Sequence, residues 1–438
     1  MEKTKKLGGK FWLALTIFSL MGQIAWVIEN MYLNVFIYKK FEASPEDIAS
    51  MVAASAITAT LTTVFMGALS DRIGKRRLLI CGGYILWGIS IFSFVLVDRL
   101  ETMNLIAASL GVTLTILLDC VMTFFGSTAN DAAFNAWLTD STDSSNIGIA
   151  EGINAMMPLV AVLAVFGGFM FLNDQNEYYW TIIFSIIGVL TFVIGIAGFF
   201  LIKEPKMEKA EMGYFESIIY GFKPSTVKLT PMLYIGLAAF IVFNISIQIF
   251  MPYLIIYYEK SLAMDNYVLI MAPAIVLASV VTALWGKLYD KKGFTFSGVL
   301  SLVMLIVGYV ILFFTRTMIP VFIGSLLMMS GYLSGMAVFG ALIRDNTPKG
   351  KAGCLQGIRI FSQVLVPGIV GPFIGSAVLK NAETIKNSDG TETFLPNANI
   401  FLAAAIVAVP VFIVFFVVRN KKLRKKMNES SEEAVENE

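Results

Sequence analysis

Histidine is absent from this chain of 438 residues, and cysteine is nearly so, with three residues. Without histidine the chain lacks the side chain that usually titrates near neutral pH, so any proton transfer falls to carboxylates. Cys81, Cys120 and Cys354 lie in apolar segments without metal-ligand spacing, so we expect neither a disulfide framework nor a bound metal. Only 15% of the residues are charged and 57% are apolar. This composition indicates a protein that crosses a membrane many times rather than a large soluble core.

Long apolar runs take up most of the chain. About twenty apolar residues suffice to cross a bilayer as a helix, so these runs predict twelve spans. The spans lie at roughly 11–37, 47–70, 77–97, 105–138, 149–172, 179–202, 231–258, 266–289, 295–315, 319–344, 354–380 and 398–418. Lys and Arg gather in both tails and in alternate loops. The positive-inside rule therefore places both termini in the cytoplasm. The expected location is the cell membrane, inner or plasma.

The chain divides into two similar halves. A charged stretch from Lys203 to Lys228 separates six spans from six, and its Glu-Pro and Lys-Pro dipeptides favour a linker. An ungapped repeat matches Gly126, Phe134 and Asp140 with Gly331, Phe339 and Asp345. These features predict an all-α membrane protein of two pseudo-symmetric six-helix bundles. The expected parts are an N-terminal bundle at 1–202, a cytoplasmic linker at 203–230, a C-terminal bundle at 231–418 and a charged cytoplasmic tail at 419–438.

A short basic turn, Gly67-Ala-Leu-Ser-Asp-Arg-Ile-Gly-Lys-Arg-Arg77, joins the second and third predicted spans. We expect Gly67 to let two helices approach closely and Gly74 to permit a tight reversal. The carboxylate of Asp71 can meet the N-terminus of a neighbouring helix. A degenerate copy of the turn begins at Gly286 and contains Asp290.

The turn resembles the signature loop between the second and third helices of the major facilitator superfamily. The turn occurs twice, each time between apolar spans, which makes the resemblance specific. The resemblance covers essentially the whole chain. The resemblance implies alternating access by rocking of two bundles, with the loop stabilising the outward-facing state. Asp140 is the expected partner of Arg72 or Arg76, and the second copy is expected to form a weaker lock. The gating residues so implied are Gly67, Asp71, Arg72, Gly74, Arg76, Asp140, Gly286 and Asp290.

The first predicted span carries polar residues at bilayer depth, where they are costly and mark candidate sites. At about 100° per residue, Gln23, Asn30 and Asn34 align on one stripe, with Trp26 and Glu29 to one side. An aromatic ring beside amides and a carboxylate suits a sugar, whose apolar face would lie on Trp26. We expect Glu29 to carry a coupled proton. The alternative is that the amides only hold helices together.

Other spans supply further candidates. Asp119 and Asp131 on the fourth span could take up a proton or a cation, although Asp119 could equally face water in an outer vestibule. In the second half, Gln248 is the counterpart of Glu29 in the repeat, and Asn244 and Gln363 are further candidates for substrate binding.

Two groups of polar residues favour a structural role. Arg359 could bind a substrate or a carboxylate, but a salt bridge at the cytoplasmic gate is the favoured interpretation. Ser55, Thr58 and Thr62 lie on one face of the second span, where small polar residues usually serve packing.

Below the superfamily, the segment from Asn130 to Asp140 and the polar first span resemble the glycoside–pentoside–hexuronide cation symporters and their sucrose-transporter relatives. The second span here has Ser and Thr where that branch has carboxylates, which argues against sodium coupling. The function expected is uptake of a small sugar or glycoside together with a proton. The alternatives are a proton-coupled exporter of amphipathic compounds and a non-transporting membrane receptor or scaffold.

The sequence has no nucleotide-binding loop of the Gly-x-x-x-x-Gly-Lys-Ser/Thr type, which disfavours ATP-driven transport. We expect no cofactor, no enzymatic reaction and no nucleic-acid partner. The expected partners are a small-molecule substrate, a proton and the lipid bilayer, with the chain acting as a monomer.

Overall fold

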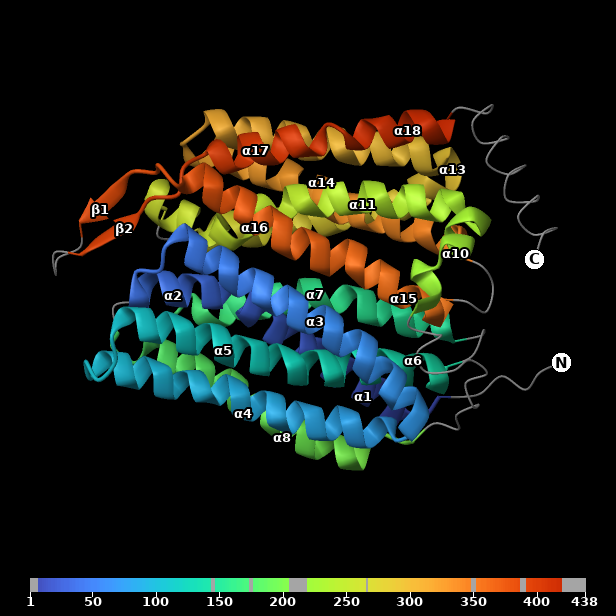
Figure 1. The fold of residues 1–438 in the computed structure, drawn as a ribbon, viewed down its shortest axis with the longest axis horizontal. Coiled ribbons are helices and arrows are strands. Elements are labelled where there is room, and N and C mark those ends of the chain that lie inside the picture. Colours follow the sequence, from blue (N-terminus) through green and yellow to red (C-terminus); the bar gives the residue numbers. More distant parts are fainter. Residues whose placement is uncertain are drawn as a thin grey trace. The chain divides into compact units, whose positions relative to one another are not determined.

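The computed structural model describes residues 7–142, 146–172, 176–204, 219–264, 267–347, 352–386 and 391–419. The chain divides into two compact units, Met1–Tyr214 and Phe215–Glu438. Most described elements are helices (Figure 1). A helix satisfies its backbone hydrogen bonds internally, as a chain surrounded by hydrocarbon must. Residues 205–218 of the expected linker and 420–438 of the expected tail lie outside the described residues.

The first unit contains six helices that are long and apolar enough to cross a membrane. The second of these six, α3, begins with a capping box between Ser44 and Asp47, and its C-cap is Gly74, where φ is 66°. Its elements are α1 (Gly9–Val27), η1 (Ile28–Tyr32), α2 (Leu33–Phe41), α3 (Pro45–Ile73), α4 (Arg76–Thr102), α5 (Ala108–Gly126), η2 (Ser127–Phe134), α6 (Asn135–Ser141), α7 (Ile147–Phe169) and α8 (Tyr179–Leu201).

The second unit is built in the same way, with a two-stranded hairpin in addition. The hairpin pairs Thr384 with Phe394 in an antiparallel register, and the sequence did not predict it. The elements are η3 (Tyr220–Phe222), α10 (Pro224–Leu229), α11 (Pro231–Phe250), η4 (Met251–Tyr253), α12 (Leu254–Ile256), η5 (Tyr257–Ser261), α13 (Val268–Phe314), α14 (Met318–Asp345), α15 (Ala352–Ile360), η6 (Phe361–Leu365), α16 (Val366–Leu379), β1 (Thr384–Lys386), β2 (Glu392–Phe394), α17 (Asn399–Ala408) and α18 (Val411–Arg419).

The element α13 consists of two helices joined at Gly293, whose φ of 77° and ψ of 177° are not helical. The indole Nε1 of Trp285 donates a hydrogen bond to the backbone oxygen of Ser297 at 3.1 Å. In a continuous helix, the backbones of two residues twelve positions apart are separated by about 18 Å along the axis, which is farther than the indole can reach. The chain must therefore fold back at Gly293. The described residues contain eleven apolar helices of membrane-crossing length, and α13 accounts for two of the predicted spans.

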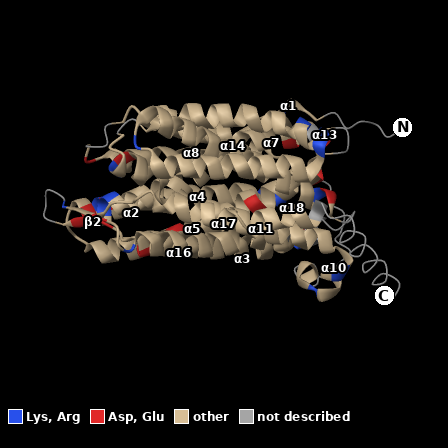
Figure 2. Cartoon of the chain, turned by 90° about the horizontal axis from the view of Figure 1, so that it is seen from above, with Lys and Arg blue, Asp and Glu red and all other residues tan. Residues whose placement is uncertain are grey.

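Charged residues lie mostly at the ends of the helices, and uncharged residues make up most of the middles (Figure 2). This distribution is expected for helices that cross a bilayer, because a charge in the hydrocarbon region is costly. The few charged residues buried along the helices are therefore the first candidates for functional residues.

Candidate functional site

Four π-helical turns interrupt the described helices, and three of them contain residues that the sequence singled out. Glu29 and Asn30 lie in η1, Asn130 and Asp131 lie in η2, and Gln363 lies in η6. A π-turn holds one extra residue and weakens the regular hydrogen-bond ladder, and such turns are frequent at functional sites. The predicted polar positions thus coincide with local departures from α-helix.

Glu29 is buried, with 6% of its surface exposed. Its Oε1 atom accepts hydrogen bonds from the Ser55 hydroxyl at 2.6 Å and the Thr123 hydroxyl at 2.9 Å. The two hydroxyl oxygens lie 2.9 Å from each other. The Oε2 atom of Glu29 has no hydrogen-bond partner among the described residues. Three helices, containing η1, α3 and α5, therefore meet at one carboxyl group.

Asp119 lies beside this group. It is 2% exposed, and its carboxyl interacts electrostatically with Glu29 and with Ser55. Its Oδ1 atom has no hydrogen-bond partner within the described part of the chain. Asp119 is therefore not a residue of an open vestibule within this unit but the second carboxyl of a buried pair.

Asp131 lies at the edge of the pair. It is half-buried, it accepts a hydrogen bond at 3.3 Å from the Asn130 amide, and its charge acts on Glu29.

The hydroxyl of Tyr84 lies 2.7 Å from the Phe18 backbone oxygen and 3.1 Å from Asn130 Oδ1. Sequence reasoning did not predict Tyr84, because a tyrosine in an apolar run carries no signal of its own.

The first helix passes this point at Gly22. A Cβ atom built on Gly22 would lie 2.5 Å from Asn130 Oδ1 and 2.7 Å from the Tyr84 hydroxyl. Only glycine lets α1 approach η2 this closely. The contact between Tyr84 and Asn130 therefore depends on the residue at position 22.

The amide nitrogens of Asn30 and Asn34 are less available to bind a substrate than the sequence suggested. Asn30 and Asn34 each donate a hydrogen bond of 2.8 Å to a backbone oxygen of their own helix, those of Trp26 and Asn30. Asn34 is buried and Asn30 is exposed, so the two do not share an environment. The predicted stripe assumed 100° per residue, and the wider turn of η1 rotates the positions that follow it.

Gln23 and Trp26, like Asn30, are accessible parts of the predicted stripe, whereas Asn34 is buried. Gln23 and Trp26 are half-buried, and the Trp26 ring lies 5.2 Å from the Trp87 ring, centroid to centroid. The Oδ1 atom of Asn34 has no hydrogen-bond partner among the described residues.

In the second unit the candidate residues occupy several environments. Asn244 is buried and donates to the Phe240 backbone oxygen at 2.8 Å. Gln248 is half-buried and packs against α16 at Gly371, where an added Cβ would lie 2.4 Å from the Gln248 Cβ. Gln363 is half-buried in η6, and Arg359 is exposed on α15.

The signature turn forms around Arg76, which is 2% exposed. Its guanidinium contacts Asp71, donates to Asp140 Oδ2 at 3.0 Å, and donates to the Ser70 hydroxyl at 2.6 Å. The sequence left the partner of Asp140 open between Arg72 and Arg76, and the structure selects Arg76. Arg72 is exposed. The end of α3, the start of α4 and α6 are thus joined by one cation.

The expected close approach at Gly67 is not present within the first unit. A Cβ atom built on Gly67 would meet no described atom within 4 Å, and the same holds for Gly286. Gly67 is half-buried and Gly286 is exposed, and neither uses its lack of a side chain for packing within its own unit.

The second copy of the turn uses different contacts. Asp290 is exposed, and the hydroxyl of Tyr289 donates to Asp345 Oδ2 at 2.8 Å. Asp345 is the repeat counterpart of Asp140. A tyrosine hydroxyl therefore contacts the carboxylate that the buried Arg76 contacts in the first half, and the Oδ1 atom of Asp345 also pairs with the exposed Arg344 at 3.7 Å.

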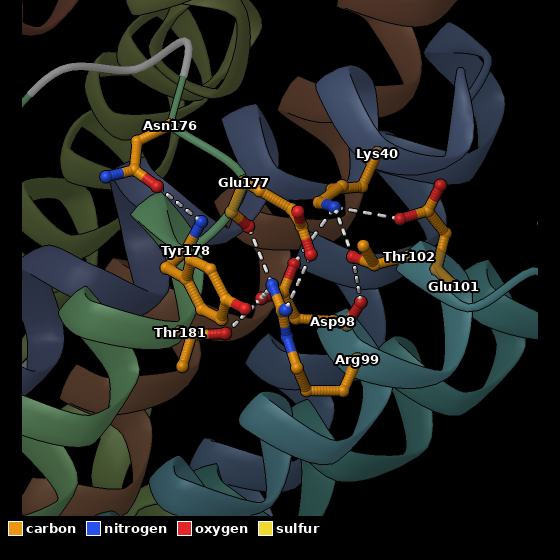
Figure 3. A network of polar contacts seen from close by, with 9 residues as sticks. All are labelled: Lys40, Asp98, Arg99, Glu101, Thr102, Asn176, Glu177, Tyr178 and Thr181. Atoms are coloured by element: carbon orange, nitrogen blue, oxygen red, sulfur yellow. Dashed lines mark hydrogen bonds and ion pairs between the residues drawn. The ribbon is translucent and has the colours of Figure 1, made fainter.

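A second buried charge lies at the other end of α4, and sequence reasoning did not predict it (Figure 3). Asp98 is completely buried. Its carboxylate lies 3.1 Å from Lys40 Nζ and 3.3 Å from Arg99 Nη2, and it accepts a hydrogen bond of 2.6 Å from the Thr181 hydroxyl. The partners come from α2 and α8, so Asp98 joins the ends of three helices.

An outer shell surrounds Asp98. Lys40 also pairs with Glu101 at 2.8 Å, and Arg99 pairs with Glu177 at 3.1 Å and lies over the Tyr178 ring at 4.5 Å (Figure 3). In the sequence, Lys40 and Arg99 look like ordinary loop cations. The one available signal was an aspartate at the end of an apolar run.

Comparisons with known proteins agree with this architecture. A model of the Major Facilitator Superfamily matches residues 11–372. The quinolone resistance protein NorA of Staphylococcus aureus (strain MSSA476) is 26% identical over 203 residues, which are 44% of this chain. The match spans about half of that relative, 47% of its length.

Two solved structures share the fold. The nucleoside transporter NupG superposes with a TM-score of 0.68 at 12% identity, covering 93% of this chain and 99% of that chain. The inward-open xylose transporter XylE from E. coli superposes with a TM-score of 0.68 at 13% identity, covering 93% of this chain and 96% of that chain. The predicted helical membrane fold is confirmed. Because the family model covers most of its length, this chain belongs to the Major Facilitator Superfamily, a family of membrane transporters and not of enzymes.

Proposed function

We propose that this protein is a proton-coupled secondary transporter and that Glu29 and Asp119 hold the coupled proton. One observation carries the proposal. Two carboxyl groups lie together in the interior of the first unit, and each has an oxygen atom without a hydrogen-bond partner among the described residues.

A charge is costly to bury away from water. Two neighbouring buried carboxylates without a compensating cation are strongly unfavourable. The groups that act on this pair are the Ser55 and Thr123 hydroxyls and the Asp131 carboxylate, with no Lys or Arg among them in the described residues. A bound proton relieves the repulsion, and release of that proton makes the pair unstable until another cation or a new conformation relieves it. Such a pair can link proton occupancy to conformation.

The remaining candidates have supporting roles in this proposal. The two halves, 1–202 and 231–418, act as the moving bundles, with 203–230 as the linker and 419–438 as the tail. Both termini lie in the cytoplasm and the protein is in the cell membrane. Arg76 with Asp71 and Asp140 forms a gate contact that is made in one of the two states.

A small sugar or glycoside is the first candidate substrate. Gln23 and Trp26 are half-buried in the first helix, so they offer one amide and part of a ring face to a solute. The resemblance of the segment from Asn130 to Asp140 to glycoside symporters supports the same class.

Export of amphipathic compounds is the second candidate. The sequence similarity to a quinolone resistance protein favours it. The amide nitrogens of Asn30, Asn34 and Asn244 are bonded to their own backbones, which leaves fewer donors for a polyhydroxylated solute.

The test has two stages. Purified protein is first screened for thermal stabilisation by sugars, glycosides and cationic amphipathic dyes, because a ligand that binds the folded state raises its apparent stability. The best ligand is then followed in proteoliposomes under an imposed pH step, in the wild type and in Glu29→Gln and Asp119→Asn. Glu151→Gln, which alters an exposed carboxylate on α7, is the control.

We expect the wild type and Glu151→Gln to concentrate the ligand and Glu29→Gln to exchange it without concentrating it. Accumulation by Glu29→Gln at the wild-type level would refute the role of this carboxyl. Accumulation driven by a sodium gradient alone would show that the pair binds sodium. Absence of flux in the wild type for every stabilising ligand would favour a receptor.

A further inference from the structure

Three oxygen atoms form a closed triangle at the centre of the first unit. Ser55 Oγ lies 2.6 Å from Glu29 Oε1, Thr123 Oγ1 lies 2.9 Å from the same atom, and the two hydroxyls lie 2.9 Å apart. Every edge of the triangle is short enough for a hydrogen bond. Thr123 is fully buried and Ser55 is 9% exposed, so water reaches this triangle poorly.

The number of hydrogen atoms distinguishes the two charge states of Glu29. Each hydroxyl carries one hydrogen. When Glu29 is ionised, both hydroxyls donate to Oε1, and no hydrogen remains for the edge between Ser55 and Thr123. When Glu29 is protonated on Oε1, its own hydrogen becomes the third. The Glu29 carboxyl then donates to Thr123, Thr123 donates to Ser55, and Ser55 donates back to Glu29.

The triangle therefore fits both states by rotation of two hydroxyl groups, without movement of a heavy atom. Ser55 has a second connection, because it also interacts with the Asp119 carboxyl. Two other ionisable groups interact with the pair in the described residues: Asp131 from η2, whose charge acts on Glu29, and the Cys120 thiol from α5, on which both carboxyls act. Ser55 is thus the hydroxyl that both buried carboxyls share.

We propose that Ser55 and Thr123 are positioning residues for proton binding, which stabilise the ionised Glu29 by two hydrogen bonds and rearrange when the proton arrives. The inference rests on the proposed function of the carboxyl pair. It also revises the expected role of Ser55, which the sequence assigned to packing. The two residues stand 26 and 94 positions from Glu29 in the chain.

The inference predicts the direction of a pH shift. A hydrogen bond donated to a carboxylate favours the ionised form. Ser55→Ala removes one such donor, so the proton should be held to a higher pH. A bond to a charged group is strong enough to move the midpoint by about one pH unit. Thr123→Val should act in the same direction, and Ser55→Thr and Thr123→Ser, which keep a hydroxyl, should restore the midpoint.

Infrared difference spectroscopy of the purified full-length protein measures the pH midpoint of Glu29 protonation. The method needs no transport substrate, since the probe is the proton. The carbonyl stretch of a protonated carboxyl is followed against pH, and loss of its Glu29 component in Glu29→Gln assigns it. Thr115→Val is the matched control, because Thr115 is fully buried on the same helix as Thr123 but donates to its own backbone at Gly111.

The outcomes separate the two proposals. If Glu29→Gln leaves the titrating band unchanged, Glu29 does not bind the proton and the proposed function fails. If the band belongs to Glu29 but Ser55→Ala titrates like Thr115→Val, the carboxyl pair stands and the positioning role is refuted. A shift of about one pH unit upward in Ser55→Ala, reversed in Ser55→Thr, is the supporting result.

Discussion

Asp98 offers the sharpest test of how charge stabilises the first unit. We expect Asp98→Asn to lower stability strongly, because Lys40 and Arg99 would keep their charges and lose their buried partner. Breaking a buried ion pair by removal of one partner costs about 3–5 kcal/mol. The side chains of Lys40 and Arg99 are 18% and 19% exposed, and each retains a second carboxylate, at 2.8 Å and 3.1 Å. These residual pairs reduce the expected loss to about 2–3 kcal/mol.

The corresponding change in apparent Tm follows from the size of the unit, Met1–Tyr214. At about 2–4 °C per kcal/mol, the loss corresponds to a decrease of about 4–12 °C. The assay is the fraction of detergent-purified protein that stays folded after heating over a temperature series. Membrane proteins often unfold irreversibly, so all variants must be heated at one rate and compared by rank.

Glu101→Gln is the control, because it removes a carboxylate from the same network at its partly exposed rim. The Glu101 side chain is 29% exposed, and an exposed pair contributes about 0–1 kcal/mol. If Asp98→Asn loses no more stability than Glu101→Gln, burial does not determine the strength of this network. A Lys40→Met variant completes the cycle: combined with Asp98→Asn it should cost less than the sum of the two single changes.

Three further predictions concern the backbone and the signature turn. Gly293→Ala should destabilise the protein by about 1–3 kcal/mol, since alanine strains at φ 77° and ψ 177°, whereas Gly286→Ala, which meets no described atom, should leave the apparent Tm unchanged. Gly22→Ala should push Asn130 away from its tyrosine partner and lower the apparent Tm; an unchanged value would show that this close approach is not required. Arg76→Lys should keep substrate binding but slow transport, because a lysine ammonium cannot hold three partners in the planar geometry of a guanidinium. Binding and flux are measured separately for that variant, and loss of binding with an unchanged conformational balance would contradict a gating role.

The sequence predicted the features that depend on local properties. Spans can be located from apolar length alone, because the bilayer requires about twenty apolar residues whatever their neighbours are. The turn between Gly67 and Arg77 identified the family, since its residue types and spacing occur within one short segment. The reversal at Gly293 was implied by the second copy of that turn, and the non-helical backbone of Gly293 separates the two helices of α13 there.

Features that depend on contacts between distant residues could not be read from the sequence. From the sequence, Arg72 and Arg76 were both possible partners of Asp140, and only the packing of α6 against α4 selected the buried Arg76. Asp98 looked like the end of an apolar run, yet it is joined to Lys40 on α2 and Thr181 on α8.

The first helix shows the same division. Its sequence alone determined that Glu29 lies at membrane depth, because burial along a span follows from position and length. Whether Glu29 has neighbours that accept or share a proton depends on residues 26 and 94 positions away, on α3 and α5. The π-turn at η1 then decided which first-helix amides are buried, since one extra residue per turn rotates all later positions. Hydrophobic length is a one-dimensional property, whereas the partners of a buried charge are set by how the helices pack in three dimensions.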